Sequence, residues 1–245
     1  MQNFRPNESA IPPVVKNLII INVIMLLATY VLNMRGIDLA KILGLHYYAS
    51  PDFRPYQLVT HMFMHGGFMH LLFNMFALWM FGRVLENVWG PKRFFIFYFV
   101  TGLGAAIFYT FVNFIEFQYF ASKMTPEAVQ DIIANGAEIL RQGQNYTGQA
   151  GKLNMLLNIP TVGASGAVFG ILLGFGMLFP NTELMLLFPP IPIKAKYFVA
   201  GYGAIELFSG LTNSGGNIAH FAHLGGMLFG FIMIKYWNRQ TNNFY

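Results

Sequence analysis

Six apolar segments, separated by polar or proline- and glycine-rich stretches, form the main pattern of this chain. They cover residues 14–34, 67–88, 94–117, 162–179, 197–211 and 218–237. A helix needs about 20 apolar residues to cross the hydrocarbon core of a bilayer, and the segments are near that length. The pattern therefore predicts an all-α, polytopic membrane protein with a bundle of six transmembrane helices.

The polar stretches predict how the rest of the chain is organised. We expect one membrane domain over residues 14–238, with outer loops at 35–66 and 118–160, between cytoplasmic tails at 1–13 and 239–245. In the second loop, Thr125, Pro126 and Glu127 have the residue types of a helix start, and they predict a surface helix over residues 126–141. No small-residue cleavage site follows the first apolar segment, so we expect that segment to be retained as a span.

Composition narrows the class of protein further. Hydrophobic residues make up 55% of the chain, charged residues only 10%, and the mean hydropathy is +0.48. Soluble domains contain about 25% charged residues, so a single soluble domain is excluded and a bilayer must cover most of the apolar surface. The chain has no cysteine, which excludes disulfides, thiol catalysis and cysteine-ligated metals.

The charges between the segments predict the orientation of the helices. With six spans, both ends of the chain lie on the same side of the membrane. The segments on that side carry nine basic and three acidic residues, whereas the segments on the other side carry six basic and six acidic residues. Cytoplasmic loops carry the excess of Lys and Arg, so we expect cytoplasmic termini. The second, fourth and sixth segments then all begin at the outer side. The net charge of +5 forms no basic patch with interleaved aromatics, so nucleic acid is not an expected partner.

Polar side chains gather at the starts of those three segments. They are His61, His65, His70, Asn74, Ser165, Asn217, His220 and His223. Such groups are costly in a membrane and usually face a cavity or a partner. Because the three segments run in the same direction, we expect these side chains to lie at similar depth near the outer surface.

Glycine spacing predicts that two of these groups meet. Glycines recur at intervals of four residues in the fourth and sixth segments, at Gly166, Gly170, Gly174, Gly226 and Gly230. Small residues at this spacing allow transmembrane backbones to approach closely. Ser165 lies one residue before the first set and His223 three residues before the second. If the two sets face each other, Ser165 and His223 meet near the outer ends of their helices.

Such a contact permits nucleophilic chemistry. A serine hydroxyl becomes a good nucleophile when an adjacent imidazole takes its proton. The resulting oxyanion needs donors, which His70, Asn74 and the backbone N–H of Ser165 near a helix N-terminus can supply.

Two other interpretations stay open at this point. His61 with His65, or His220 with His223, has a spacing that suits a metal ion, although no carboxylate lies beside them in the outer halves of the second or sixth segment. A channel or transporter would also place Ser and His in the membrane. Its polar groups should continue across the bilayer, but the inner halves of the fourth and sixth segments contain nothing ionisable before Lys235.

The combination of these motifs resembles the rhomboid family of intramembrane serine proteases. The nucleophile motif matches residues 163–166 (GASG), and the base motif, a histidine followed by glycines three and seven residues later, matches His223. His70 and Asn74 match the family's HxxxN motif, and Gly82 and Glu86 match a glycine and a glutamate that follow it. The resemblance covers residues 55–237.

The resemblance implies an activity and a set of roles. Ser165 would be the nucleophile and His223 the general base and acid of a dyad that requires no aspartate, no metal and no other cofactor. Oxyanion binding and support would come from His70, Asn74, Gly163 and Ala164, and a water-filled cavity would include His65, Phe169 and His220. The substrates would be transmembrane proteins, cut near the outer ends of their helices, in a bacterial inner membrane. The fifth helix and the loop after it would move sideways to admit them.

The sequence departs from the family in the first loop and in the fourth segment, and its fifth segment carries an unusual acid. Tyr56 and Gln57 stand where the family often has Trp-Arg, and Phe169 replaces a frequent tyrosine that stacks on the catalytic histidine. Glu206 is an acid inside the fifth segment, and it would either pair with a histidine as a third catalytic member or bond elsewhere in the bundle. An inactive relative that binds membrane proteins is the remaining alternative, although such relatives usually lack the serine or the histidine.

Overall fold

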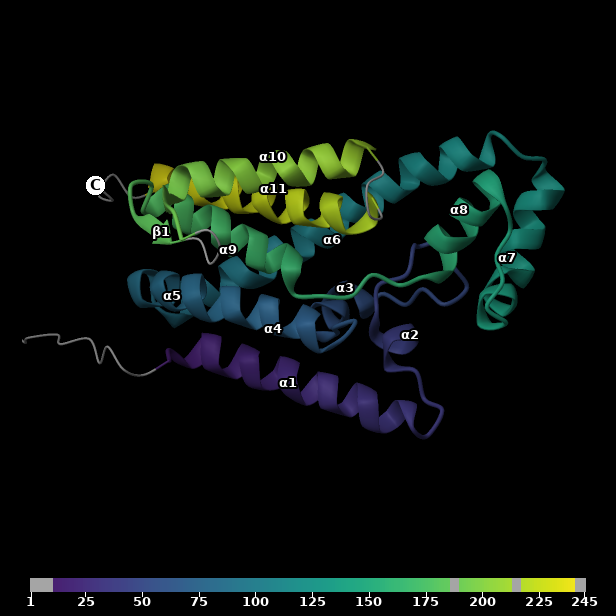
Figure 1. Cartoon of the computed structure of the whole chain (residues 1–245), viewed down its shortest axis with the longest axis horizontal. Helices are drawn as coiled ribbons and strands as arrows, with labels where there is room; N and C mark the ends of the chain where they lie inside the picture. The colour runs from purple at the N-terminus through teal and green to yellow at the C-terminus, as the bar shows by residue number, and fades with distance from the viewer. Residues whose placement is uncertain (1–10, 186–189, 213–216, 241–245) are drawn as a thin grey trace, which may run out of the picture.

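The computed structural model of the chain describes residues 11–185, 190–212 and 217–240, apart from the side chains of 217–219 and 240. The main body consists of α1 (Pro13–Asn33), α4 (Phe68–Ala77), the π-helical turn η2 (Leu78–Gly82), α5 (Arg83–Trp89), α6 (Pro91–Ala121), α9 (Ser165–Leu178), α10 (Ala195–Thr212) and α11 (Asn217–Gln240). These helices run along the long axis of the molecule, and the start of α1 and the end of α11 lie at the same end (Figure 1).

The opposite end carries short elements. They are α2 (Leu39–Leu43), α3 (Gln57–Thr60), the 3₁₀ turn η1 (His61–Phe63), α7 (Pro126–Arg141) and α8 (Gly148–Asn158). The predicted surface helix is confirmed as α7, where the Thr125 side chain accepts a hydrogen bond from the N–H of Ala128. The short elements α2, α3, η1 and α8 were not predicted, nor was the hairpin of β1 (Glu183–Met185) with β2 (Pro192–Lys194).

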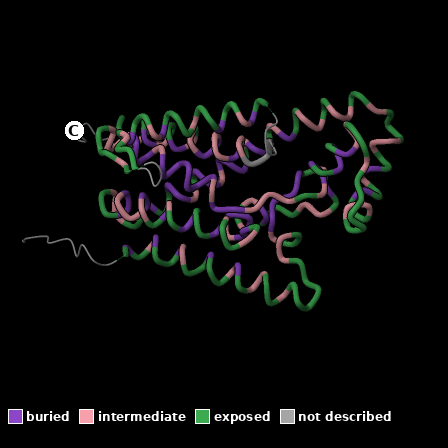
Figure 2. Tube along the Cα trace, in the orientation of Figure 1, coloured by how far each residue is buried: buried purple, intermediate pink, exposed green. Residues whose placement is uncertain are grey.

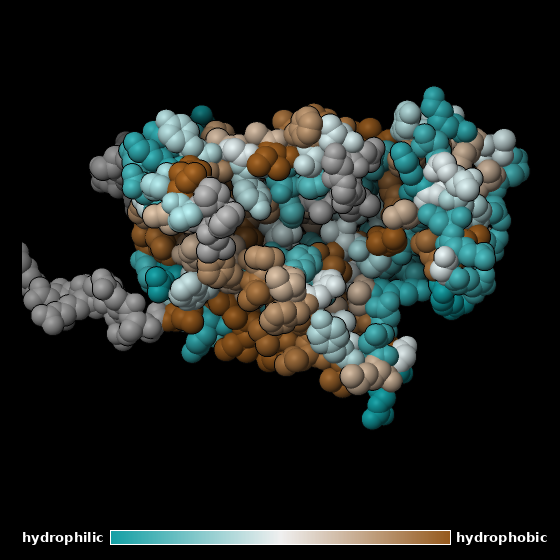
Figure 3. All heavy atoms as spheres, in the orientation of Figure 1, coloured by the Kyte–Doolittle hydropathy of each residue, from teal (hydrophilic) through white to brown (hydrophobic). Residues whose placement is uncertain are grey.

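The predicted all-α membrane architecture is confirmed. Among the described residues, three helices, α1, the continuous Phe68–Trp89 segment and α6, are long and apolar enough to cross a bilayer, and α9 is a shorter apolar helix. Exposed residues of α1 form a stripe of Ile20, Ile24, Leu27 and Val31, as a surface in contact with lipid requires. Hydrophobic atoms cover the middle of the visible face beside hydrophilic atoms at the α7 and α8 end (Figure 3). The number of six spans stays a prediction.

The fourth apolar segment forms a shorter helix than its composition predicts. Apolar residues begin at Val162, but α9 starts only at Ser165. Gly163 has a φ of 137°, which is outside the helical region, and Thr161 pairs with Leu45 as an isolated β-bridge. Residues 162–164 are therefore a buried connection rather than the first turn of a helix.

Helix α9 lies at the centre of the bundle, and α11 packs closely on it. Ten of its 14 residues are buried, and Figure 2 shows this buried band between the outer helices. A Cβ added at Gly226 would collide with the backbone carbonyl of Gly166, and one at Gly230 would lie 3.3 Å from the Cα of Gly170. The predicted approach of the two glycine sets is confirmed at these two pairs, whereas Gly174 faces α5 and α6.

The first outer loop is held together by Gln57. Its side-chain amide donates to the carbonyls of Ile42 and Asp52, and its oxygen accepts from the N–H groups of His46 and Arg54. This side chain is 1% exposed, so all four bonds are shielded from water. Gln57, which differs from the family's frequent Trp-Arg at this place, therefore holds this loop together.

Glu86 caps α1 from a distant part of the chain. Its two carboxylate oxygens accept hydrogen bonds from the N–H groups of Val14 and Val15, at 2.9 and 2.8 Å, and the residue is 2% exposed. These N–H groups have no partner within their own helix, because they belong to its first turn. Glu86 therefore fixes the N-terminus of α1 against α5.

Replacing Glu86 with glutamine is expected to lower the free energy of unfolding by about 1–3 kcal/mol, because one acceptor and the negative charge at a helix N-terminus are lost. The measurement is thermal unfolding in detergent. Glu127→Gln is the matched control, because that side chain is exposed at the start of α7. Equal melting temperatures for the two variants would contradict the capping role.

Candidate active site

Ser165 is the first residue of α9, and the connection before it is fixed by the backbone. The N–H of Gly163 donates to the carbonyl of His61 at 2.9 Å, and the bridge between Thr161 and Leu45 holds the preceding residues. Helix α9 can begin here because Gly163 tolerates its positive φ. The hydroxyl of Ser165 thus stands at a helix N-terminus, where backbone N–H groups are unpaired.

The structure brings Ser165 and His223 together. The Nε2 atom of His223, on α11, lies 2.8 Å from the Oγ of Ser165, which is hydrogen-bonding distance. Both residues are half-buried. The predicted contact between a hydroxyl and an imidazole from two different helices is therefore present.

The plane of the His223 ring is held by aromatic packing. Phe169, one turn after Ser165, stacks on it with ring centroids 4.1 Å apart and an angle of 6° between the planes. The ring of Tyr202, on α10, packs against Phe169, with ring centroids 5.4 Å apart. Stacking of Phe169 was expected from the family resemblance, whereas the contribution of Tyr202 was not.

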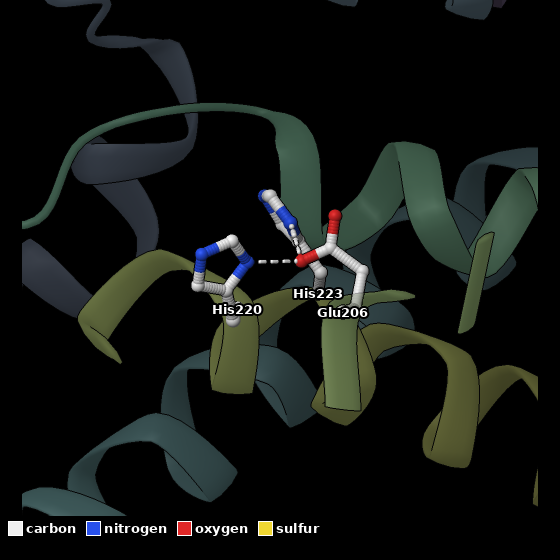
Figure 4. Close-up of side chains that lie close together, drawn as sticks. All are labelled: Glu206, His220 and His223. Carbon is white, nitrogen blue, oxygen red and sulfur yellow. Dashed lines mark hydrogen bonds and ion pairs between the residues drawn. The ribbon is translucent and has the colours of Figure 1, made fainter. Parts of the chain in front are cut away.

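Glu206 of α10 pairs with both histidines of α11. Its Oε2 atom lies 3.0 Å from the Nδ1 of His223 and 2.6 Å from the Nδ1 of His220 (Figure 4). Of the two alternatives for this acid, pairing with a histidine is the one present. The sequence could flag Glu206 as an intramembrane acid, but its partners depend on how α10 and α11 pack.

The same three residues offer ligand atoms that lie within 4.8 Å of one another. The sequence argument against a metal considered only the second and sixth segments, and Glu206 adds a carboxylate from the fifth. In this structure the Nδ1 atoms of both histidines hydrogen-bond to the Oε2 of Glu206.

Two cavities open onto Ser165 and His223. One, of about 120 Å³, also touches His61, His70 and Gly163, and it has room for several waters. The other, of about 400 Å³, runs between α4 and α10 and is mostly apolar. Besides Ser165 and His223, its lining includes His70, Asn74, Phe73, Phe76, Phe198 and Tyr202.

His70 faces the space beside the Ser165 hydroxyl. Its Nδ1 accepts a hydrogen bond of 3.3 Å from the N–H of Gly66, so in the neutral ring the proton is on Nε2. A Cβ built on Gly163 would lie 3.0 Å from that Nε2 and 3.5 Å from the Ser165 Oγ. The missing side chain of Gly163 thus leaves a space that a small oxygen atom can fill within reach of both groups.

Asn74 is turned partly toward its own helix. Its side-chain amide donates to the carbonyl of His70 at 2.8 Å, and the residue lines the larger cavity. An amide has two N–H groups, so one N–H remains that can donate a hydrogen bond to a group in that cavity. Ala164, the last of the predicted supporting residues, is fully buried directly before Ser165.

The remaining predicted residues lie at the edge of the site. His65 is 4% exposed, packs edge-on against His70 with ring centroids 5.1 Å apart, and does not line the two cavities at Ser165. His220 likewise contacts Glu206 rather than these cavities. His61, in the outer loop, hydrogen-bonds to the Gln57 carbonyl, and burial lowers its pKa to about 4. The side chain of Asn217 and residues 213–216, the proposed mobile loop, lie outside the described residues.

Comparisons with known proteins agree with this geometry. The family model described as "Rhomboid domain" matches residues 52–240. The chain is 28% identical over 174 residues to "Rhomboid protein 1, mitochondrial" of Saccharomyces cerevisiae, covering 71% of this chain and 39% of that protein. It is 24% identical over 216 residues to "Rhomboid-like protein 16, chloroplastic" of Arabidopsis thaliana, covering 88% and 59%. It is 26% identical over 179 residues to the human "Presenilin-associated rhomboid-like protein, mitochondrial", covering 71% and 36%.

These relatives are longer proteins, since the matches cover only 39%, 59% and 36% of their lengths. The family match, by contrast, includes every helix from α3 to α11 and, apart from Leu45, all the residues that line the two cavities. With its apolar helices, the chain is an integral membrane protein, and it belongs to the rhomboid family.

Proposed function

We propose that this protein is an intramembrane serine endopeptidase in which Ser165 and His223 form the catalytic dyad. The observation that supports it most directly is the 2.8 Å contact between the Oγ of Ser165 and the Nε2 of His223. The proton of Ser165 moves to Nε2 as Oγ bonds to the scissile carbonyl carbon. His223 then returns that proton to the leaving amine, and a water hydrolyses the acyl-enzyme by the same route.

The oxyanion is held beside Gly163. The Nε2–H of His70 and the backbone N–H of Ser165 are the proposed donors, with the second N–H of Asn74 in support. The space at Gly163, 3.0 Å from the His70 Nε2 and 3.5 Å from the Ser165 Oγ, supports this assignment. The smaller cavity supplies the water that hydrolysis needs at this depth.

The substrates are transmembrane helices of other membrane proteins. An apolar cavity between α4 and α10 ends at Ser165 and His223, and its Phe and Met lining suits an apolar segment rather than a charged peptide. Movement of α10 widens this cavity to admit the substrate. Cytoplasmic termini and an active site that opens outward follow from the charge bias, and the bacterial inner membrane stays a prediction from the sequence.

A fluorophosphonate probe tests the proposal directly. We expect the folded protein in detergent to be labelled at Ser165, because only an activated serine reacts readily with such a reagent. Mass spectrometry of the labelled peptide identifies the residue. Ser209, also a helix residue but on α10, is the internal control and should stay unmodified. A folded protein that resists the probe would instead support the alternative of an inactive relative.

A further inference from the structure

The carboxylate of Glu206 extends the Ser165–His223 pair into a line of three side chains. His223 uses one ring nitrogen for each neighbour: Nε2 lies 2.8 Å from the Ser165 Oγ, and Nδ1 lies 3.0 Å from the Glu206 Oε2. The side chain of Glu206 is only 8% exposed, so water competes little for this bond. The serine, the histidine and the acid come from α9, α11 and α10.

We propose that Glu206 is a positioning residue for His223, which makes the proposed dyad a Ser–His–Glu triad in this protein. The inference deepens the proposed function and depends on it. An ionised carboxylate can only accept hydrogen bonds, so the Nδ1 of His223 must donate. The Nε2 atom of the neutral ring then carries the lone pair, which is the tautomer that accepts the Ser165 proton.

The negative charge has a second effect when the reaction begins. Proton transfer from Ser165 turns His223 into an imidazolium, and the carboxylate beside Nδ1 balances that charge. In a membrane, where water is scarce, a nearby counter-charge stabilises the imidazolium more than it would in solution. Glu206 thereby acts through His223 and touches no reacting atom.

His220 holds Glu206 in this position. Its Nδ1 lies 2.6 Å from the same Oε2 atom, from a residue one turn before His223 on α11. The carboxylate is thus fixed by two bonds from one helix, and Figure 4 shows His220 and His223 pointing at it from the same side. This anchor explains why α10 can carry a buried acid without leaving it unpaired.

The first test compares the kinetics of Glu206→Gln with those of the unmodified protein on a model transmembrane substrate. We expect kcat to fall on the order of 10²-fold with little change in KM, less than the roughly 10⁴-fold seen when a triad acid is replaced, because Phe169 also holds the ring. Glu206→Asp keeps the charge and should restore part of kcat. His220→Leu should cause a smaller loss than Glu206→Gln.

Two measurements distinguish the positioning role of Glu206 from a role in folding alone. Active-site titration with the fluorophosphonate gives the folded fraction, and kcat is calculated per titrated site. Nitrogen NMR of isotopically labelled histidines then reports the His223 tautomer, which should be the Nδ1–H form in the unmodified protein and a mixture in Glu206→Gln. Glu127→Gln on α7 is the matched control and should change neither quantity.

The outcomes distinguish this inference from the proposed function. If Ser165→Ala abolishes cleavage but Glu206→Gln keeps kcat within about twofold, the triad is refuted and the dyad stands. A loss in Glu206→Gln that disappears when rates are expressed per titrated site would also refute it. If EDTA removes the activity and zinc restores it, the three ligand atoms serve a metal instead, and the positioning role is wrong.

Discussion

Replacing Ser165 with alanine is expected to lower kcat for cleavage of a model transmembrane substrate by about 10⁴-fold or more, and His223→Ala should have an effect of similar size. The hydroxyl supplies the nucleophile, and the imidazole 2.8 Å away takes its proton. Of the other imidazoles that line the two cavities, His70 uses its Nδ1 to accept from Gly66, and the Nδ1 of His61 bonds to the Gln57 carbonyl. Cleavage is measured as product formation in proteoliposomes.

The double variant makes this prediction sharper. Because the two residues act as one unit, Ser165→Ala/His223→Ala should be little slower than either single variant. All three proteins should accumulate in the membrane and unfold near the same temperature, since both side chains are only half-buried. Cleavage that survives in either single variant would refute the enzyme assignment, and additive losses would argue against a shared step.

Replacing Gly226 with alanine is expected to damage both stability and activity. The new Cβ would collide with the backbone carbonyl of Gly166, which cannot move aside as a flexible side chain can. Overpacking of this kind costs about 1–3 kcal/mol. To relieve it α11 must shift from α9, and a displacement of about 1 Å between reacting groups can cost 10²-fold in rate. Thermal unfolding and kcat per titrated site measure the two effects.

Gly201→Ala is the matched control for this experiment. Gly201 lies in α10, and an added Cβ would meet no atom within 4 Å. Alanine is the better helix former by about 1 kcal/mol, so this variant should be as stable as the unmodified protein or slightly more so. If Gly226→Ala behaves like Gly201→Ala, the close contact between α9 and α11 does not set the geometry of the site.

Several features of the site were predictable because they depend on local spacing. The repeat of glycines every four residues fixes one helix face whatever the surroundings, so an approach of the two glycine sets could be predicted, although not which glycines would pair. Ser165 lies just before one glycine set and His223 just before the other. Their contact was therefore predicted for the case in which the two sets face each other, and it is present. The surface helix α7 was predictable for a similar reason, because its capping residues are adjacent in the sequence.

Other features depend on contacts between distant residues. Apolar composition predicts a helix from residue 162, but α9 begins only at Ser165. The backbone of Thr161 hydrogen-bonds to Leu45 and that of Gly163 to His61, so these residues are not helical. Nothing in the sequence around Glu86 reveals that it caps a helix 71 residues earlier. His65 was expected in the cavity, yet it lies behind His70, because its side-chain direction depends on how η1 leads into α4.

The sequence by itself determined that this chain is a helical membrane protein and which helix faces carry Ser165 and His223, because hydropathy and residue spacing are properties of single helices. Only the tertiary structure decided what surrounds that pair. Glu206 reaches His223, and Tyr202 reaches the Phe169 ring that stacks on His223, through the rotation and crossing of α9, α10 and α11. Rotation of one helix against another is set by the packing of all its neighbours, which no single segment records.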